Sequence, residues 1–335
     1  MGSTAHYIDK DWKLQKHLAA FDFFGPPHGG EQIGEKILDI AEKTHITDKL
    51  QCLVGDSASS NVSGKRHFAT VLEEKTGSKW SYMEDFIHCS AHSLNLVAKD
   101  LCELFVVKEK RHGKDIEVTY GDKDLESASR KGRMVGAIAK LSRMAALQNK
   151  GVHFLAAWKN CAAQVNATKR ESKLKLITAV ETRWSSRYFQ IRRAIKLRHI
   201  YNRMTLDPAY VSYSLSENEW RLLIWLRDIL AVIDKALQTL AATETVTISH
   251  MVPTFSMLFD ALENYEAVDN ETDQERQLRE DAVKKAKDKL EKYYAHTSIN
   301  PNYVFGMREF YYLLQRQLAD NHLLSSRPSL WFPIH

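Results

Sequence analysis

The chain has 335 residues and a formal net charge of +5, and its 44% hydrophobic and 27% charged residues are the balance of a globular protein with one or two domains. It has no run of 18 apolar residues and no apolar stretch near its start, so we expect no transmembrane helix and no signal peptide. Its four cysteines form no CxxC pair, which excludes a structural zinc site of the usual spacing and points to a reducing compartment, the cytosol or the nucleus.

The first 107 residues alternate between strand-like and helix-like patterns. Two strands are expected around a tight turn at 9–11, and Gly77 is placed to end the second of the helices that follow. In chain order, the expected elements are strands 4–9 and 12–23, helix 31–43, strand 50–54, helix 60–75, strand 86–88 and helix 91–105. This order predicts an α/β fold class, with a mixed sheet covered by helices.

The character of the chain changes after Val107. Long helices are expected at 216–242, 249–265 and 271–294, the last a solvated outer helix because its charges recur at i,i+4 spacing, and 176–180 is the one strand candidate. We therefore divide the chain into an α/β core at 1–107, a loop at 108–129, a mostly helical domain at 130–320 and an irregular tail at 321–335.

Positive charge is concentrated in the middle of the chain. From Arg130 to Arg203 there are eighteen Lys and Arg residues against two acids, Glu171 and Glu181, so this segment carries +16 and the rest of the chain −11. Such a segment favours a polyphosphate as its partner, because each neutralised phosphate releases condensed counterions. The alternative is a solvated helical surface, which is the usual role of a charge run.

Asp56 follows the apolar run Leu53-Val54 and precedes a helix start, so it is expected at the C-terminal end of a buried strand. A carboxylate in that position can hold Mg²⁺, which prefers oxygen ligands. The alternative is a turn or helix N-cap aspartate, which is the commoner use of this residue type. The sequence alone leaves both interpretations open.

Two further segments carry residues of chemical interest. Cys89 and His92 have the CxxH spacing that places both on one face at a helix start, although two ligands make no zinc site and a packed Cys with a hydrogen-bonded His is an equal alternative. Trp184 lies between Arg183 and Arg187, where an exposed indole can stack on an unpaired base while guanidinium groups hold phosphates. The alternative for Trp184 is a core aromatic.

Four segments, taken in order, make the chain resemble the hAT transposases, the family named after hobo, Ac and Tam3. The resemblance runs from about residue 4 to about residue 300. The matching segments are Ala5–Asp9 with Trp12–Leu14, Gly55–Asn61, His88–Leu96 and Glu181–Ser186, with further agreement at Asp288–Tyr294 and Asn300-Pro301. The family's fold, an RNase H-like domain interrupted by a large all-α insertion, agrees with the α/β-then-helical pattern.

The resemblance also implies roles for particular residues. Asp56 matches the second carboxylate of the family's DDE triad, which binds Mg²⁺ or Mn²⁺ for two-metal phosphoryl transfer. Cys89 and His92 match its CxxH motif near the DNA ends, and Trp184, flanked by Arg183, matches a tryptophan that stacks on a flipped base. The expected DNA-binding residues, which include arginines after the tryptophan, are Cys89, His92, Arg183, Trp184, Arg187, Arg192 and Arg193.

Parts of the family pattern are missing from this sequence. Only Met1 to Thr4 precede the Ala5–Asp9 strand, so the first strand with the first Asp of the triad is absent, and no Ser-Glu-Arg-like motif supplies the last Glu. We therefore expect a nuclear, DNA-binding, transposase-derived protein that has lost catalysis, with no metal bound. Dimerisation through the family's C-terminal segment is not expected. The alternatives are a truncated gene model of an active Mg²⁺-dependent transposase and a domesticated protein-interaction module.

Overall fold

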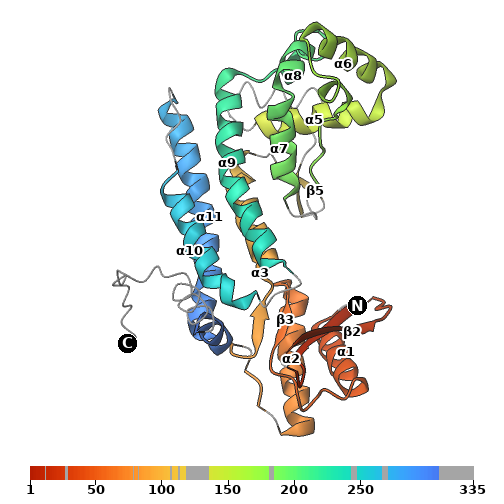
Figure 1. The fold of residues 1–335 in the computed structure, drawn as a ribbon, viewed down its shortest axis with the longest axis vertical. Helices are drawn as coiled ribbons and strands as arrows, with labels where there is room; N and C mark the ends of the chain where they lie inside the picture. Colours follow the sequence, from red (N-terminus) through yellow and green to blue (C-terminus); the bar gives the residue numbers. More distant parts are fainter. Residues whose placement is uncertain are drawn as a thin grey trace. The chain divides into compact units, whose positions relative to one another are not determined.

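The computed structural model describes residues 1–11, 13–26, 29–77, 79–81, 83–105, 108–111, 114–117, 136–180, 185–242, 247–265 and 271–308. Helices dominate these residues (Figure 1). The chain divides into two compact units. Unit 1 comprises Met1–Ser93, Thr239–Ser256 and the chain from Lys292 onward, and unit 2 comprises Leu94–Gln238 and Met257–Glu291. Because this division does not test the limits at 107, 129 and 320, those domain boundaries stay predictions.

Unit 1 begins with an antiparallel hairpin of β1 (Gly2–Ile8) and β2 (Leu14–Phe21), which confirms the predicted pair of strands. Asp9 explains the tight turn between them. Its Oδ1 accepts hydrogen bonds from the backbone N–H groups of Asp11 and Lys13, both at 2.9 Å. This is the Asx-type turn that a short acidic side chain favours, so the turn is encoded locally.

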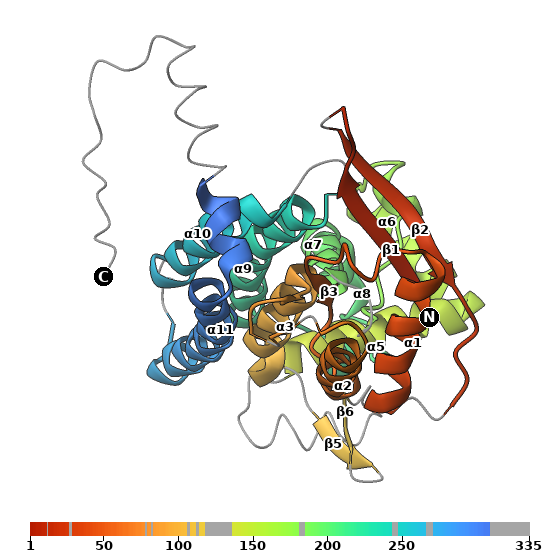
Figure 2. The ribbon, with the colours of Figure 1, turned by 90° about the horizontal axis from the view of Figure 1, so that it is seen from below.

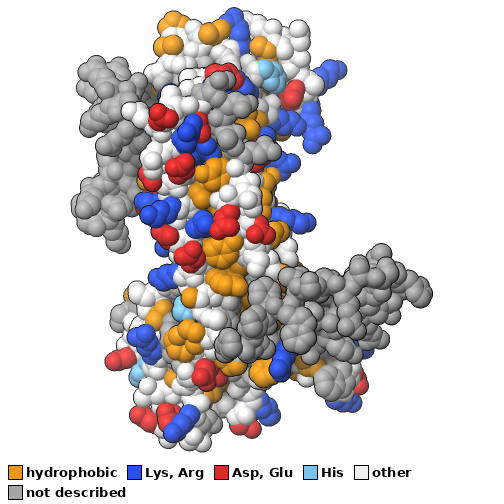
Figure 3. Space-filling view, turned by 90° about the vertical axis from the view of Figure 1, so that its left-hand side faces the viewer, with side chains coloured by type: hydrophobic (Ala, Val, Ile, Leu, Met, Phe, Trp, Pro, Cys, Tyr) orange, Lys and Arg blue, Asp and Glu red, His pale blue; other side chains and the backbone are white. Residues whose placement is uncertain are grey.

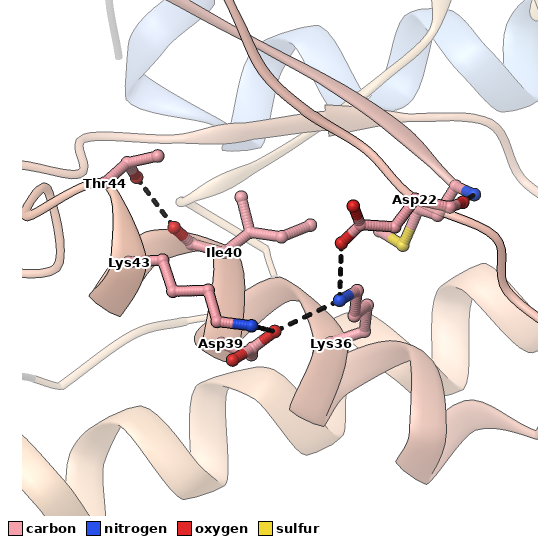
Figure 4. Close-up of polar contacts among 7 residues, drawn as sticks. Asp22, Lys36, Asp39, Ile40, Lys43 and Thr44 are labelled. Atoms are coloured by element: carbon pink, nitrogen blue, oxygen red, sulfur yellow. Dashed lines mark hydrogen bonds and ion pairs between the residues drawn. The ribbon is translucent and has the colours of Figure 1, made fainter.

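An ion-pair network joins the end of β2 to the first helix, α1 (Gly30–Lys43) (Figure 4). Lys36 Nζ lies 2.6 Å from Asp22 Oδ2 and 3.1 Å from Asp39 Oδ2. Lys43 Nζ lies 2.8 Å from the same Asp39 oxygen. These groups are partly exposed, so the network orients the chain more than it stabilises the fold.

Helix α1 packs closely against α2 (Ser59–Thr76), and both confirm the predicted helices (Figure 2). Two glycines allow the close approach: a Cβ on Gly34 would lie 2.7 Å from the backbone oxygen of Gly64, and one on Gly64 would lie 2.6 Å from Ile33 Cγ2. Gly77 ends α2 in the left-handed conformation, with φ of 72°, and its N–H donates to the Glu73 carbonyl at 2.8 Å.

The strands β3 (Leu53–Gly55) and β4 (Phe86–His88) pair in parallel and lie at predicted positions. The predicted single mixed sheet, however, is not what the described residues form, since β1–β2 and β3–β4 are separate two-stranded sheets. The reason is the brevity of β3 and β4: three residues each make one short ladder and extend no further. The core of this region is instead a side-chain cluster of Leu38, Phe68, Leu72 and Phe86.

Helix α3 (Ser90–Cys102) and the 3₁₀ turn η1 (Glu103–Phe105) together cover the predicted helix 91–105. Beyond them the structure corrects the prediction of a loop at 108–129. A short antiparallel hairpin forms there from β5 (Lys108–Arg111) and β6 (Lys114–Glu117). A polar composition predicts a loop, but the hydrogen bonds of a hairpin come from the backbone and need no apolar face. Residues 118–129 lie outside the described part of the chain.

The helices of the central region pack around a few large, fully buried side chains, among them Trp158, Tyr201 and Trp220. Tyr201 donates its hydroxyl proton to the Tyr213 carbonyl at 2.8 Å, and Trp220 Nε1 donates to Asn202 Oδ1 at 3.0 Å. The elements are α5 (Gly136–Lys150), α6 (Val152–Gln164), η2 (Glu171–Lys173), α7 (Ser186–Lys196), α8 (Arg198–Met204), η3 (Val211–Tyr213) and the first part of α9 (Glu217–Leu240). The segment 176–180 is not a strand, which corrects that prediction.

The three long helices predicted from periodicity are confirmed: α9, then α10 (Met251–Glu263), which follows the short turn η4 (Ile248–His250), and α11 (Asp273–Ile299). Helix α11 is more than a solvated outer helix, because Ala282, Ala286 and Leu290 on one side are fully buried. After α11, residues 301–308 are also helical, and Asn300 Nδ2 donates to the Phe86 carbonyl of β4 at 3.1 Å within unit 1. None of the helices in the described residues is long and apolar enough to cross a membrane.

Candidate functional site

Asp56 and Cys89 follow two neighbouring strands at the same edge of their sheet. Gly55 of β3 pairs with His88 of β4, and each of the two candidate residues comes directly after its strand. The Cys89 N–H donates to the Gly55 carbonyl at 2.8 Å, which extends the parallel ladder by one bond. Asp56 therefore lies where the sequence predicts it, between the end of a strand and the start of α2.

The Asp56 carboxylate is held at the beginning of α2. Its Oδ1 accepts hydrogen bonds from the Ala58 N–H at 2.9 Å and from Asn61 Nδ2 at 2.7 Å. Burial by itself favours the protonated acid, but these hydrogen bonds, with smaller contributions from His92 and Lys65, lower the pKa of Asp56 below its ordinary value. The side chain is thus an anion at neutral pH and also acts as the predicted turn aspartate.

The resemblance implies Mg²⁺ or Mn²⁺ at Asp56, and the donor set can be tested against that ion. A hard divalent cation needs several oxygen ligands that converge on one place. Within the part of the chain that the structure describes, no three His, Cys, Asp or Glu side chains gather into a group that could hold a metal ion. The described residues therefore do not by themselves fit the ion, at Asp56 or at the CxxH pair.

Lys65 is a buried cation close to this carboxylate. Lys65 is 4% exposed, and its Nζ donates to the Gly55 carbonyl at 3.3 Å. The same Nζ lies 5.9 Å from the centroid of the Phe86 ring. Burial lowers the pKa of Lys65, while Asp56 opposes that shift. The edge of the β3–β4 pair thus carries a carboxylate and an ammonium group together.

His88, the last residue of β4, is surrounded by polar and aromatic groups from four segments. Ser57 Oγ and His88 Nδ1 share a hydrogen bond of 3.1 Å, and the ring of His296 lies 4.7 Å away between centroids. Burial first, and then the nearby positive groups at His296, Lys65, Lys292 and His92, lower the pKa of His88 to about 4. The imidazole of His88 is therefore neutral at physiological pH.

Cys89 and His92 lie at the start of α3. The Cys89 carbonyl accepts hydrogen bonds from Ser93, from its N–H at 3.0 Å and its hydroxyl at 3.2 Å, and both candidate side chains are half-buried. His92 is close enough to Asp56 to lower the pKa of that carboxyl. The packed-Cys interpretation and the role of this pair near DNA both remain open predictions.

The predicted arginines of α7 differ in what holds them. Arg187 Nη1 donates to Gln190 Oε1 at 2.7 Å, and Arg193 Nη1 donates to the Lys175 carbonyl at 2.8 Å. Arg192 is exposed, and its Cζ lies 5.8 Å from the centroid of the Tyr188 ring. The structure therefore brings Arg187 and Arg193 into internal hydrogen bonds and leaves Arg192 facing solvent.

Arg183 and Trp184 lie outside the described residues, but the chain on both sides of them is described. The Ser186 hydroxyl donates to the Val180 carbonyl at 2.8 Å and accepts from the Val180 N–H at 3.2 Å. Ser186 thereby joins the residue before Glu181 to the start of α7.

Comparison with known proteins gives the context for these residues. Residues 1–79, which include Asp56, match the family model of the ZBED1 RNase-like domain. The putative AC transposase of Zea mays is 26% identical over 267 residues, which are 78% of this chain and 29% of that protein. The putative AC9 transposase of Zea mays is 36% identical over 99 residues, which are 29% of this chain and 12% of that protein. The chain is a hAT transposase-like protein.

A third relative of the chain is described as a transcriptional regulator and not as a transposase. The putative transcriptional regulator tpeD of Talaromyces stipitatus is 23% identical over 303 residues, which are 89% of this chain and 32% of that protein. The chain spans about a third of the length of these first two curated relatives, 32% of tpeD and 29% of the AC transposase. The resemblance stated from the four sequence segments is confirmed.

Lys65, His88 and His296 lie around the ends of β3 and β4 and are residues that the sequence does not predict there. Lys65 lies on a helix, where lysine is normally exposed, and no local signal marks it as buried. His88 belongs to the motif His88–Leu96 without a predicted role of its own, and His296 becomes its neighbour only through the fold. The small residue Gly64 next to Lys65 was the one available sign of close packing at this face of α2.

The His88–His296 pair predicts a pH dependence of stability. Because the pKa of His88 in the folded chain, about 4, lies below its ordinary value of 6.5, the unfolded chain binds more protons between these values. The contribution of His88 to the free energy of unfolding is then fully present above about pH 6.5 and falls as the pH drops toward 4. In His88→Asn, which keeps a polar atom near Ser57, the midpoint of thermal unfolding is expected to vary less with pH over this window.

The exposed His153 provides the matched control for this measurement. His153→Asn is expected to leave the pH profile of the unfolding midpoint as in the wild type. Identical profiles for the wild type and His88→Asn would contradict the burial of a neutral imidazole at position 88.

Proposed function

We propose that the chain is a DNA-binding protein derived from a hAT transposase and that these 335 residues bind DNA without cleaving it. The observation that carries the proposal is the one-sided charge of residues 130–203, eighteen cations against two acids. Glu171, one of those acids, is engaged by Thr168, whose N–H and hydroxyl donate to Glu171 Oε2 at 3.0 and 2.8 Å. Glu171 stays ionised beside His199 and Lys196, but the cations of the segment outnumber its acids, which favours a phosphate partner.

Three of the expected DNA-contacting residues are proposed from the family resemblance alone: Arg183, Trp184 and the CxxH histidine, His92. Trp184 would stack on an unpaired base and Arg183 would contact the adjacent phosphate. A nuclear location follows from DNA as the partner.

The proposed lack of cleavage rests on the donor set around Asp56. Two-metal phosphoryl transfer needs several carboxylates that hold two cations about 3.5–4 Å apart. Asp56 is the one matched carboxylate of the triad, and its Oδ1 is already engaged by Ala58 and Asn61. We further propose that residues 1–107 correspond to part of an RNase H-like core and residues 130–320 to a helical insertion.

The experiment measures binding and cleavage of duplex DNA by the same protein, with Mg²⁺ or Mn²⁺ present. We expect the wild type and Asp56→Asn to bind with similar affinity, in the range of about 10⁻⁴–10⁻⁶ M at physiological salt that is usual for non-specific binding. Neither protein is expected to produce nicked or cut strands. Cleavage that disappears in Asp56→Asn would overturn the inactivity, and an absence of DNA binding would instead favour a protein-interaction module.

A further inference from the structure

Two basic segments of unit 2 are held side by side. The Arg193 guanidinium of α7 donates to the backbone carbonyl of Lys175 at 2.8 Å, which fixes the segment after η2 against this helix. His199 Nε2 of α8 lies 4.0 Å from Glu171 Oε2 of η2. The segment from Lys169 to Lys175 therefore runs beside α7 and α8, so its cations and those of the helices share one surface.

The acids near this surface are engaged by hydrogen bonds or ion pairs. Hydrogen bonds from Thr168 lower the pKa of Glu171, and His199 and Lys196 act in the same direction. Two acids at the start of α9 are engaged elsewhere: Glu217 pairs with Arg198 at 2.5 Å, and Glu219 pairs with Lys140 at 2.8 Å. These ion pairs neutralise Arg198 and Lys140, and Glu171 lies near Lys196. For the other cations of this surface, no ion pair with an acid is found among the described residues.

The outer cations form what we call the basic strip: Lys169, Arg170, Lys173, Lys175, Arg192 and Lys196. All six side chains belong to exposed residues. Arg192 and Lys196 are four residues apart on α7, and this spacing puts them on the same side of a helix. Near α5, α6 and α8 of unit 2, which lie at the top in Figures 1 and 3, Figure 3 shows Lys and Arg side chains projecting from the surface.

An aromatic pair adjoins the basic strip on α7. Phe189 is 40% exposed, and its ring lies 5.2 Å from that of Tyr188 between centroids. The guanidinium of Arg192 stacks over Tyr188, so the direction of this cation is restricted. A restricted guanidinium loses less conformational freedom when it contacts a phosphate than a free lysine does.

We propose that the basic strip is the surface through which unit 2 contacts the phosphate backbone of duplex DNA, and that Arg193 positions it by holding Lys175. The proposal rests on the proposed function and assigns DNA contact mainly to residues other than the arginines that the sequence indicates. Contacts from Lys and Arg to phosphates carry no base information. The basic strip therefore provides affinity for any duplex, and sequence preference resides elsewhere.

The test compares the salt dependence of DNA binding in two quadruple variants with that of the wild type. In the strip variant Lys169, Arg170, Lys173 and Lys175 are all replaced by Gln. Each lost phosphate contact lowers the slope of log K against log salt by about 0.9, so we expect the slope to fall in magnitude by between about 2 and 4. The loss of affinity should be the same on two duplexes of unrelated sequence.

The control variant carries the same number of substitutions on exposed lysines outside the basic strip, namely Lys10→Gln, Lys49→Gln, Lys79→Gln and Lys284→Gln. Its slope is expected to equal that of the wild type. Both variants change exposed side chains, so both are expected to keep the wild-type midpoint of thermal unfolding, which verifies that they fold.

The outcomes separate this inference from the proposed function. A wild type that binds no DNA overturns both. If the wild type binds DNA and the strip variant keeps the wild-type slope, the basic strip alone is overturned. The same conclusion follows if the slope of the control variant falls as much as that of the strip variant. A strip variant that loses binding to polyglutamate but keeps its DNA slope would mean that the surface serves an acidic protein.

Discussion

Replacing Arg279 by Ala is expected to lower the free energy of unfolding by about 3–5 kcal/mol, the range for removing one partner of a buried ion pair. Arg279 and Glu271 have side chains that are 4% and 6% exposed and are joined by two hydrogen bonds, at 2.6 and 2.8 Å. The guanidinium also lies 4.8 Å from the centroid of the Tyr265 ring and 5.4 Å from that of Trp225. The variant would leave the Glu271 carboxylate buried without this partner.

A neighbouring arginine gives a matched control for this prediction. Arg276 pairs with the same carboxylate at 3.3 Å, but its side chain is 55% exposed. Arg276→Ala should therefore cost about 1 kcal/mol or less, because solvent screens an exposed pair. Urea unfolding followed by tryptophan fluorescence measures both variants, and equal losses for the two would contradict the burial of the Arg279–Glu271 pair.

Phe68→Ala is the second change with a large expected effect, a loss of about 3–5 kcal/mol in the free energy of unfolding. Phe68 is fully buried in the core of unit 1. Its ring meets Trp80 edge to face at 5.4 Å and Phe86 at 6.5 Å between centroids. Truncation to Ala removes these contacts and leaves a cavity among side chains that belong to different elements, so the site cannot collapse easily.

Phe23 provides the control, because it is 94% exposed. Phe23→Ala makes the same chemical change at the surface and is expected to alter the free energy of unfolding by about 0.5 kcal/mol or less. Denaturant unfolding should therefore give clearly different free energies of unfolding for the two variants. A loss at Phe23 as large as that at Phe68 would contradict the core of unit 1.

Much of the local structure could be predicted from the sequence because its causes are local. The hairpin turn depends on Asp9, whose carboxylate accepts two backbone N–H groups within four residues. The end of α2 depends on Gly77, which takes up a left-handed conformation without steric cost. Long helices such as α9 carry their apolar residues at helical spacing over several turns, so their pattern is unambiguous.

The pairing of strands could not be predicted in the same way. A three-residue strand such as β3 shows the same short apolar run whether it joins a large mixed sheet or a single partner. The β5–β6 hairpin could not be predicted for a related reason. All of its strand residues except Ile116 are polar or charged, and the backbone hydrogen bonds that form it do not depend on composition.

The position of the candidate site could be predicted from the sequence, but the set of residues that surround it could not. Asp56 and Cys89 lie at strand ends as expected, whereas the burial of Lys65 depends on packing across elements. The arginines of α7 make the same point. In the sequence the three arginines are equivalent, since each carries one positive charge. In the structure Arg187 donates to Gln190 and Arg193 donates to the Lys175 carbonyl, whereas Arg192 is exposed.

The most direct test of DNA binding by this chain is the slope of log K against log salt for wild-type protein and duplex DNA. If the six cations of the basic strip contact phosphates, each contributes about −0.9, and the slope should lie between about −4 and −6. Fluorescence anisotropy of a labelled duplex at several salt concentrations gives this value. A slope between 0 and about −1, or no binding at low salt, would contradict the proposal that the positive charge of unit 2 serves to bind DNA.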